Sequence, residues 1–73
     1  MEEKVLEILK YVLEDESIDK SVSQENNSNW DSLKQLNLMV ELESEFNISI
    51  EPEMMHKMTS YETIVDNLYK IIK

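Results

Sequence analysis

The 73-residue sequence contains no cysteine and no glycine. Without cysteine the chain cannot form disulfides or thiolate metal sites, and without glycine it cannot form the Gly-rich loops that hold phosphates and dinucleotides in many enzymes. Basic residues are also scarce, because seven face sixteen aspartates and glutamates and leave a formal charge of −9. This charge repels nucleic acid and anionic membranes, so we expect neither as a ligand and expect partners with basic surfaces.

Long apolar runs are absent as well. Glu2, Glu3 and Lys4 follow Met1 with no basic leader, apolar run or cleavage site, so we expect a cytoplasmic protein outside the membrane. A chain of 73 residues buries only a modest core and leaves no room for an enclosed active site beside it. We therefore predict one domain over residues 1–73 that is monomeric and is not an enzyme.

Apolar residues recur at three- and four-residue steps, which is typical of amphipathic helices. The spacing predicts a first helix over about residues 2–14 and a second helix from the pair Asp31 and Ser32 to Phe46. Pro52 is expected to start a short third helix rich in methionine, and a last helix follows it. The sequence thus predicts an all-α fold, a small bundle of three main helices plus one short helix.

The segments between these helices also carry a pattern. Asn47 stands where a left-handed C-cap is expected, and Thr59 with Glu62 matches a capping box before the last helix. The buried face predicted for that helix consists of Ile64, Val65, Leu68, Tyr69, Ile71 and Ile72. Residues 15–29 are mostly polar and predict a long loop, which in a domain this small is usually functional or mobile.

The second helix has two apolar stripes on nearly opposite sides. One consists of Leu38, Met39, Leu42 and Phe46, and the other of Leu33, Leu36 and Val40. A helix on one side of a small bundle cannot bury both, so we predict that the first stripe is core and the second is an exposed partner contact beside Ser32, with Glu41 on its flank. The alternative is that the second stripe packs under the long loop or the short helix.

Residues 29–33 (NWDSL), followed by a helix ending in residues 41–48 (ELESEFNI), resemble the acyl carrier protein family. The resemblance covers nearly the whole chain in helix order and loop lengths. It implies that a phosphopantetheinyl transferase attaches 4′-phosphopantetheine from coenzyme A to Ser32, using magnesium, and that Asp31 helps the transferase recognise the site. The thiol of this arm would hold acyl or aminoacyl thioesters, loaded by a ligase and delivered to a synthase or transferase. Leu33, Leu36 and Val40 match family positions that contact partner enzymes.

Two departures from the family pattern are visible. Ser28 and Asn29 stand where the family often has Leu-Gly, so the entry to the helix would rely on asparagine for any left-handed turn. Lys34 and Asn37 stand where carriers of fatty acid synthesis usually have acids. This difference favours a carrier of a specialised pathway, such as polyketide, lipid-tail or aminoacyl chemistry.

The sequence favours two other functions less. Carboxylate catalysis or metal binding by Glu41, Glu43 and Glu45 is disfavoured, because these side chains do not share one face and the only histidine, His56, is expected on the exposed side of the short helix. A better rival is a noncovalent acidic adaptor that binds a partner helix through the exposed stripe. Trp30 is interpreted as an apolar anchor that closes the long loop over the core.

Overall fold

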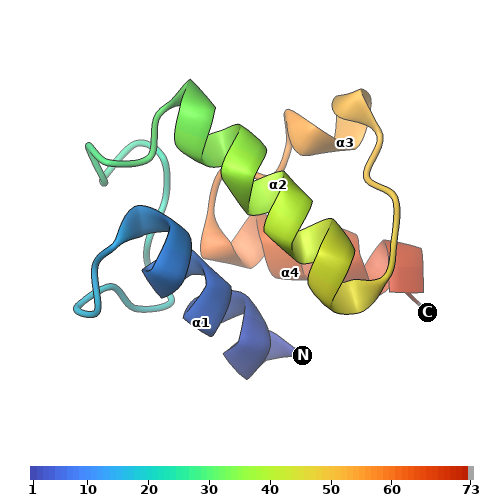
Figure 1. Ribbon diagram of the computed structural model, residues 1–73, viewed down its shortest axis with the longest axis horizontal. Coiled ribbons are helices and arrows are strands. Elements are labelled where there is room, and N and C mark those ends of the chain that lie inside the picture. Colours follow the sequence, from blue (N-terminus) through green and yellow to red (C-terminus); the bar gives the residue numbers. More distant parts are fainter. Residues whose placement is uncertain (73) are drawn as a thin grey trace.

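Four helices make up the computed structural model, which describes residues 1–72. They are α1 (Glu2–Leu13), α2 (Ser32–Phe46), α3 (Pro52–Met55) and α4 (Tyr61–Ile72). In Figure 1, α2 crosses the front of the molecule, α4 lies behind it, and α1 and the short α3 lie on opposite sides of α2. α1 packs against both α2 and α4. The predicted all-α bundle of three main helices and one short helix is confirmed.

The centre of the bundle is filled by apolar side chains from all three long helices. The largest side chains that are less than 2% exposed are Leu9, Leu13, Leu38, Leu42, Met58, Ile64, Leu68 and Val5. Burying one such side chain stabilises the fold by about 1.5–3 kcal/mol. Of the predicted core stripe of α2, three members are buried, whereas Phe46 is only half-buried at the edge of the core.

Both left-handed residues of the described chain end helices. Asn47 has φ 54° and caps α2 as predicted. Glu14 has φ 55°, so α1 ends at Leu13, one residue earlier than expected. Glycine usually occupies this position because it has no Cβ, and in this glycine-free chain glutamate and asparagine take its place. The left-handed turn suggested near Asn29 is not formed, since residues 1–72 have no other positive φ.

The start of α4 corrects two predictions. The reciprocal capping pair is Ser60 with Thr63, not Thr59 with Glu62: each hydroxyl accepts the backbone N–H of the other residue at 3.1 Å. Tyr69 and Ile72, predicted to be buried, are 52% and 43% exposed, and the Tyr69 hydroxyl donates to the Glu2 carboxylate instead. Ile72 is exposed because it lies in the last turn, where α4 ends.

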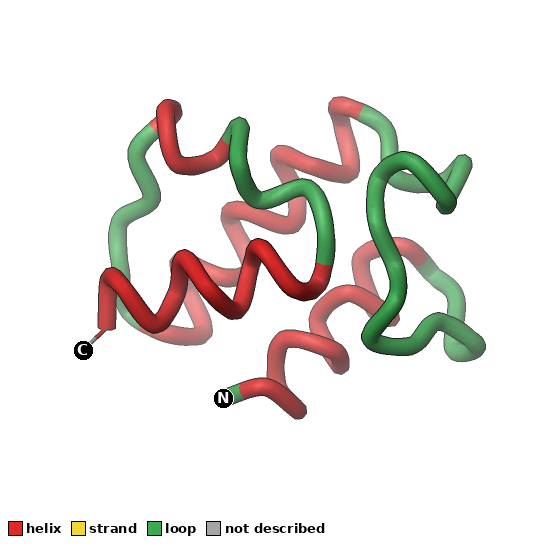
Figure 2. The backbone as a smooth tube through the Cα atoms, turned by 180° about the vertical axis from the view of Figure 1, so that it is seen from behind, coloured by secondary structure: helices red, strands yellow, loops and turns green. Residues whose placement is uncertain are grey.

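The long loop before α2 is tied to the segment that precedes α4. An isolated antiparallel bridge joins Ser23 and Ser60, and the N–H of Tyr61 donates to the carbonyl of Val22 at 3.0 Å. Val22 is buried and anchors this loop on the core. Figure 2 shows this loop from behind, folded over one end of the bundle. It leads to Trp30, which is 2% exposed and closes the loop over the core as predicted.

Candidate functional site

Ser32 is the first residue of α2 and is exposed to solvent. Asp31 precedes it as the N-cap, and its carboxylate accepts the backbone N–H of Lys34 at 2.9 Å. Asp31 therefore caps the start of α2, where the sequence placed the beginning of this helix. Buried Trp30 on one side and the 15-residue α2 on the other fix the position of Ser32. Its hydroxyl lies at the positive end of the helix dipole, where negative charge is stabilised.

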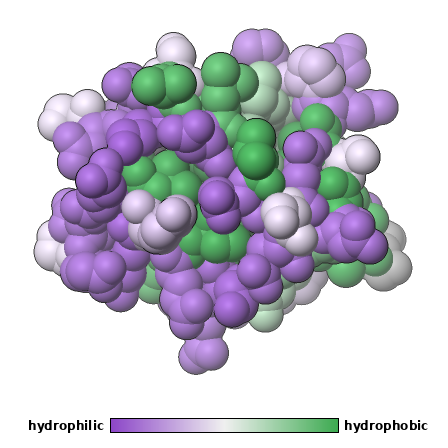
Figure 3. All heavy atoms as spheres, in the orientation of Figure 1, coloured by the Kyte–Doolittle hydropathy of each residue, from purple (hydrophilic) through white to green (hydrophobic). Residues whose placement is uncertain are grey.

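The second apolar stripe of α2, which we call the α2 stripe, consists of Leu33, Leu36 and Val40. These side chains are 65%, 54% and 62% exposed, so neither the long loop nor α3 covers them. Figure 3, which shows the face that α2 crosses, has several separate hydrophobic patches surrounded by hydrophilic atoms. The predicted exposure of the stripe is confirmed, and its role in binding partners stays a prediction.

Ser32 borders an open cavity of about 360 Å³, which we call the Ser32 cavity. Its lining comes from α2, α3 and the loops before α2 and α4, and consists of Gln24, Ser32, Gln35, Leu36, Met55, His56 and Thr59. Amide, hydroxyl and imidazole groups thus alternate with aliphatic side chains. A cavity with this lining suits a ligand that has both amide and aliphatic groups.

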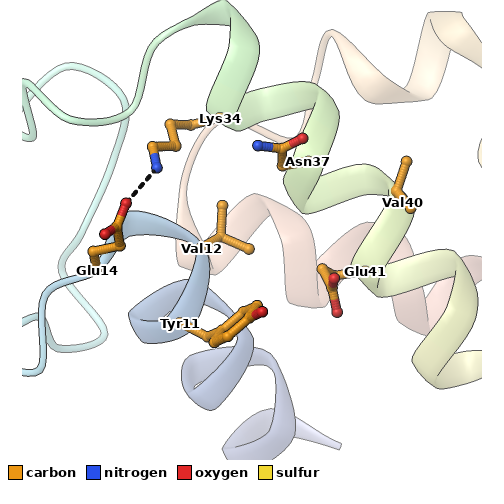
Figure 4. A pocket seen from close by; sticks show the side chains of 7 residues that line it. All are labelled: Tyr11, Val12, Glu14, Lys34, Asn37, Val40 and Glu41. Atoms are coloured by element: carbon orange, nitrogen blue, oxygen red, sulfur yellow. Dashed lines mark hydrogen bonds and ion pairs between the residues drawn. The ribbon is translucent and has the colours of Figure 1, made fainter.

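A second groove, of about 460 Å³, lies between α1 and α2 on the other flank of the stripe. Figure 4 shows the side chains that line it: Tyr11, Val12, Glu14, Lys34, Asn37, Val40 and Glu41. At one end Lys34 Nζ lies 2.9 Å from Glu14 Oε2, and this hydrogen bond, together with the lysine charge, lowers the pKa of Glu14. Lys34, noted in the sequence for its unusual sign, therefore forms an ion pair.

The site residues predicted from the sequence do not all line the same cavity. Ser32 and Leu36 line the Ser32 cavity, whereas Val40 and Glu41 line the groove between α1 and α2. Leu33 lies between them and lines neither. The predicted partner contact is thus a ridge with a hollow on each side.

Gln35 is a residue of this site that the sequence did not single out. Its Oε1 accepts the indole N–H of Trp30 at 2.5 Å, and its Nε2 donates to the carbonyls of Met55 and Met58 at 3.1 and 3.0 Å. The two carbonyls belong to residues 20 and 23 positions further along the chain. No local pattern reveals such a contact. His56, expected to be exposed, is exposed and borders the same cavity.

Acidic side chains elsewhere serve local structure. The hydroxyls and backbone N–H groups of Ser17 and Ser21 donate to Asp15 and Asp19, and these bonds lower the pKa of each aspartate. Within residues 1–72, no cluster of three histidine or acidic side chains could hold a metal ion. In that same part of the chain, no helix combines the length and apolar character needed to cross a bilayer.

The comparisons with known proteins address the fold. No protein-family model matches the sequence, and no curated protein is significantly similar to it. Among solved structures, a candidate acyl carrier protein from Mycobacterium tuberculosis is similar over 94% of this chain and 95% of its own, with a TM-score of 0.82 and 23% sequence identity. At this level of identity the similarity concerns the backbone. The chain has an acyl-carrier-like fold.

Proposed function

We propose that this protein is a covalent carrier of acyl or aminoacyl groups, and that Ser32 bears 4′-phosphopantetheine. One observation carries the proposal: an exposed serine begins α2 directly after an aspartate N-cap, in a chain with an acyl-carrier-like fold. The fold alone does not define a chemistry, because one fold hosts many functions. The serine and its surroundings supply the specific part of the proposal.

The residues around Ser32 fit the group. A phosphodiester on its oxygen would lie at the first turn of α2, where backbone N–H groups have no partner within the helix and the dipole favours an anion. The Asp31 carboxylate accepts the backbone N–H of Lys34. The N–H groups of the two residues before Lys34 in the first turn therefore remain available to the phosphate. Next to Ser32, the Ser32 cavity offers Gln24 and Thr59 beside aliphatic side chains. Pantetheine itself combines two amides with an aliphatic segment.

In the loading step, the Ser32 hydroxyl loses its proton and its oxygen forms a bond to the phosphorus that carries pantetheine. The bond from that phosphorus to the adenosine phosphate portion of coenzyme A breaks at the same centre. A phosphopantetheinyl transferase would supply magnesium and the base. Once attached, the arm supplies a thiol that holds cargo as a thioester. The contribution of this chain is to present Ser32 on a fixed helix end.

The partner enzymes would dock on the α2 stripe. Its exposed apolar side chains provide contact area, and Glu41 on the flank provides a negative charge. A formal charge of −9 favours partners with basic surfaces around the docking site. We expect these partners to be the transferase, a loading ligase and a synthase or transferase of a specialised pathway in the cytoplasm. We expect the carrier to meet them as a monomer.

The test is an intact-mass measurement on protein produced together with a phosphopantetheinyl transferase of broad specificity. We expect the mass of one phosphopantetheine to be gained, and tandem mass spectrometry should place it on Ser32. Ser32→Ala should gain nothing, while the control Ser44→Ala, which changes another exposed serine of α2, should load normally. A noncovalent adaptor would gain no mass in any variant, and an arm on Ser17 or Ser28 would contradict the assignment.

A further inference from the structure

The short helix α3 has few attachments to the rest of the molecule. It consists of residues 52–55, and none of its side chains is fully buried. The backbone hydrogen bonds of this segment are local, such as the bond from the N–H of His56 to the carbonyl of Pro52. Among residues 1–72, Gln35 is the only side chain from another element that hydrogen-bonds with residues 52–58. Besides the packing of its methionines against the core, this segment is therefore joined to α2 through one amide.

That amide has its two donor hydrogens and one acceptor site engaged at once. Its nitrogen holds the carbonyls of Met55 and Met58, and its oxygen holds the indole N–H of Trp30. Trp30 is 2% exposed, and Gln35 is the partner of its indole N–H. Losing a partner for a buried donor is costly, which makes the arrangement specific. One side chain thus joins α2, the end of the long loop and the segment after α3.

All three joined segments border the modification site proposed above. Gln35 lies about one helical turn after Ser32, Trp30 lies two residues before it, and Met55 lines the Ser32 cavity. When Gln35 is hydrogen-bonded to the Met55 carbonyl, α3 forms one wall of the Ser32 cavity. Without that bond the wall is held only by the half-buried methionines of α3 and by Met58 beyond it.

We propose that Gln35 is a positioning residue of the Ser32 site, which holds α3 as the wall of the Ser32 cavity and holds Trp30 at the entry to α2. Its effect on loading rests on the function proposed above, whereas its effect on α3 and Trp30 does not. Gln35 acts on the presentation of Ser32 and on the width of the cavity in which an attached arm would lie. It makes no bond to Ser32 itself.

The test compares Gln35→Met, which keeps the length of the side chain and removes its hydrogen bonds, with Gln24→Met. Gln24 lines the same cavity, and its side chain makes no hydrogen bond with another described residue, so it is a matched control. The chain has a single tryptophan, so the indole N–H gives one NMR resonance that reports on Trp30 alone. Amide hydrogen exchange at residues 56–58 reports on α3.

For Gln35→Met we expect the indole resonance to move upfield and exchange at residues 56–58 to rise by about tenfold per lost hydrogen bond, with exchange in α1 unchanged. The rate of loading by the transferase should fall in Gln35→Met and stay at the wild-type value in the control Ser44→Ala. Gln24→Met should keep the wild-type indole resonance and the wild-type exchange rates. Gln35→Glu separates the bonds, because it keeps an acceptor for Trp30 and loses both donors. It should release α3 while leaving the indole resonance close to its original position.

Three results would overturn the proposal. The first is Gln35→Met behaving like Gln24→Met in both the indole resonance and the exchange rates. The second is faster exchange spread evenly over all helices, which would mean that Gln35 only contributes to global stability. The third is an unchanged loading rate in a variant whose α3 is released. If wild-type protein takes no arm at all, the carrier function fails, and the first two measurements still decide whether Gln35 holds α3.

Discussion

Leu42 and Leu36 lie on the same helix and differ in burial, so together they test which face of α2 is core. Leu42 is completely buried, whereas Leu36 is 54% exposed. Changing a buried leucine to alanine lowers the free energy of unfolding by about 2–5 kcal/mol, because less apolar surface is buried and a cavity is left behind. A 73-residue domain has a free energy of unfolding of about 4–11 kcal/mol at typical values per residue. Leu42→Ala should therefore remove about half of the stability.

Leu36→Ala should cost much less. About half of this side chain already contacts water, so its removal should lower the free energy of unfolding by about 0.5–1 kcal/mol. Urea unfolding followed by far-UV circular dichroism measures both values. An unchanged slope of the free energy of unfolding against urea concentration would show that the unfolded states are comparable. Leu36→Glu adds a second readout, since a charge in the docking surface should slow loading while the protein stays folded.

Two results would contradict the predictions for Leu36. If Leu36→Ala or Leu36→Glu lowers the stability as much as the same change at Leu42, the α2 stripe is part of the core, and the docking surface beside Ser32 does not exist. If Leu36→Glu is stable and loads at the wild-type rate, the stripe is exposed but is not the surface that the transferase uses.

Three further changes test the packing, capping and charge of the same helix. Phe46→Ala should lower the free energy of unfolding by less than the roughly 3–5 kcal/mol typical of a fully buried phenylalanine, because Phe46 is only partly buried; an unchanged urea midpoint would place it outside the core. Asp31→Ala should cost about 1 kcal/mol through the lost cap and leave the helix content nearly unchanged by circular dichroism. Lys34→Met should raise the pKa of Glu14 toward 4.5, which an NMR titration would detect. The folded state lowers the pKa of Glu14, so the ion pair stabilises the protein above the unfolded pKa, and this stabilisation is lost as the pH falls through the folded pKa. Lys34→Met should therefore lose less stability than the wild type over that acidic range.

The helices could be predicted because their causes are local. Apolar spacing defined α1, α2 and α4, and an asparagine after Phe46 was enough to predict the left-handed end of α2. The start of α4 was harder, because Thr59 with Glu62 and Ser60 with Thr63 both resemble a capping pair. The choice is made by contacts with the long loop, where the bridge from Ser23 to Ser60 fixes the backbone just before the helix. Such long-range contacts have no periodicity.

The site was predictable to the same extent. Ser32, Asp31 and the α2 stripe belong to one continuous helix start, so their relative positions follow from helix geometry. The wall of the Ser32 cavity does not, because α3 and the loop residue Gln24 reach it from distant parts of the sequence. Gln35 illustrates the difference, since an exposed-looking glutamine on a helix gives no sign that two carbonyls more than 19 residues away will meet it.

The structure changes the interpretation of the charge of Lys34, because it shows the ion-pair partner of this lysine. By sequence, a lysine two residues after Ser32 weakens the negative strip that a basic partner would bind. In the structure, however, its ammonium lies against Glu14, a residue of the α1 end that is 20 positions away. The pair is close to neutral as a unit, so the flank of α2 from Lys34 to Asn37 adds no net charge to that of Asp31. Negative charge on this flank begins about two turns further on, at Glu41. A partner that docks along the α2 stripe would therefore meet the negative charge of this flank near the middle of α2, further from the helix start than the sequence alone indicated.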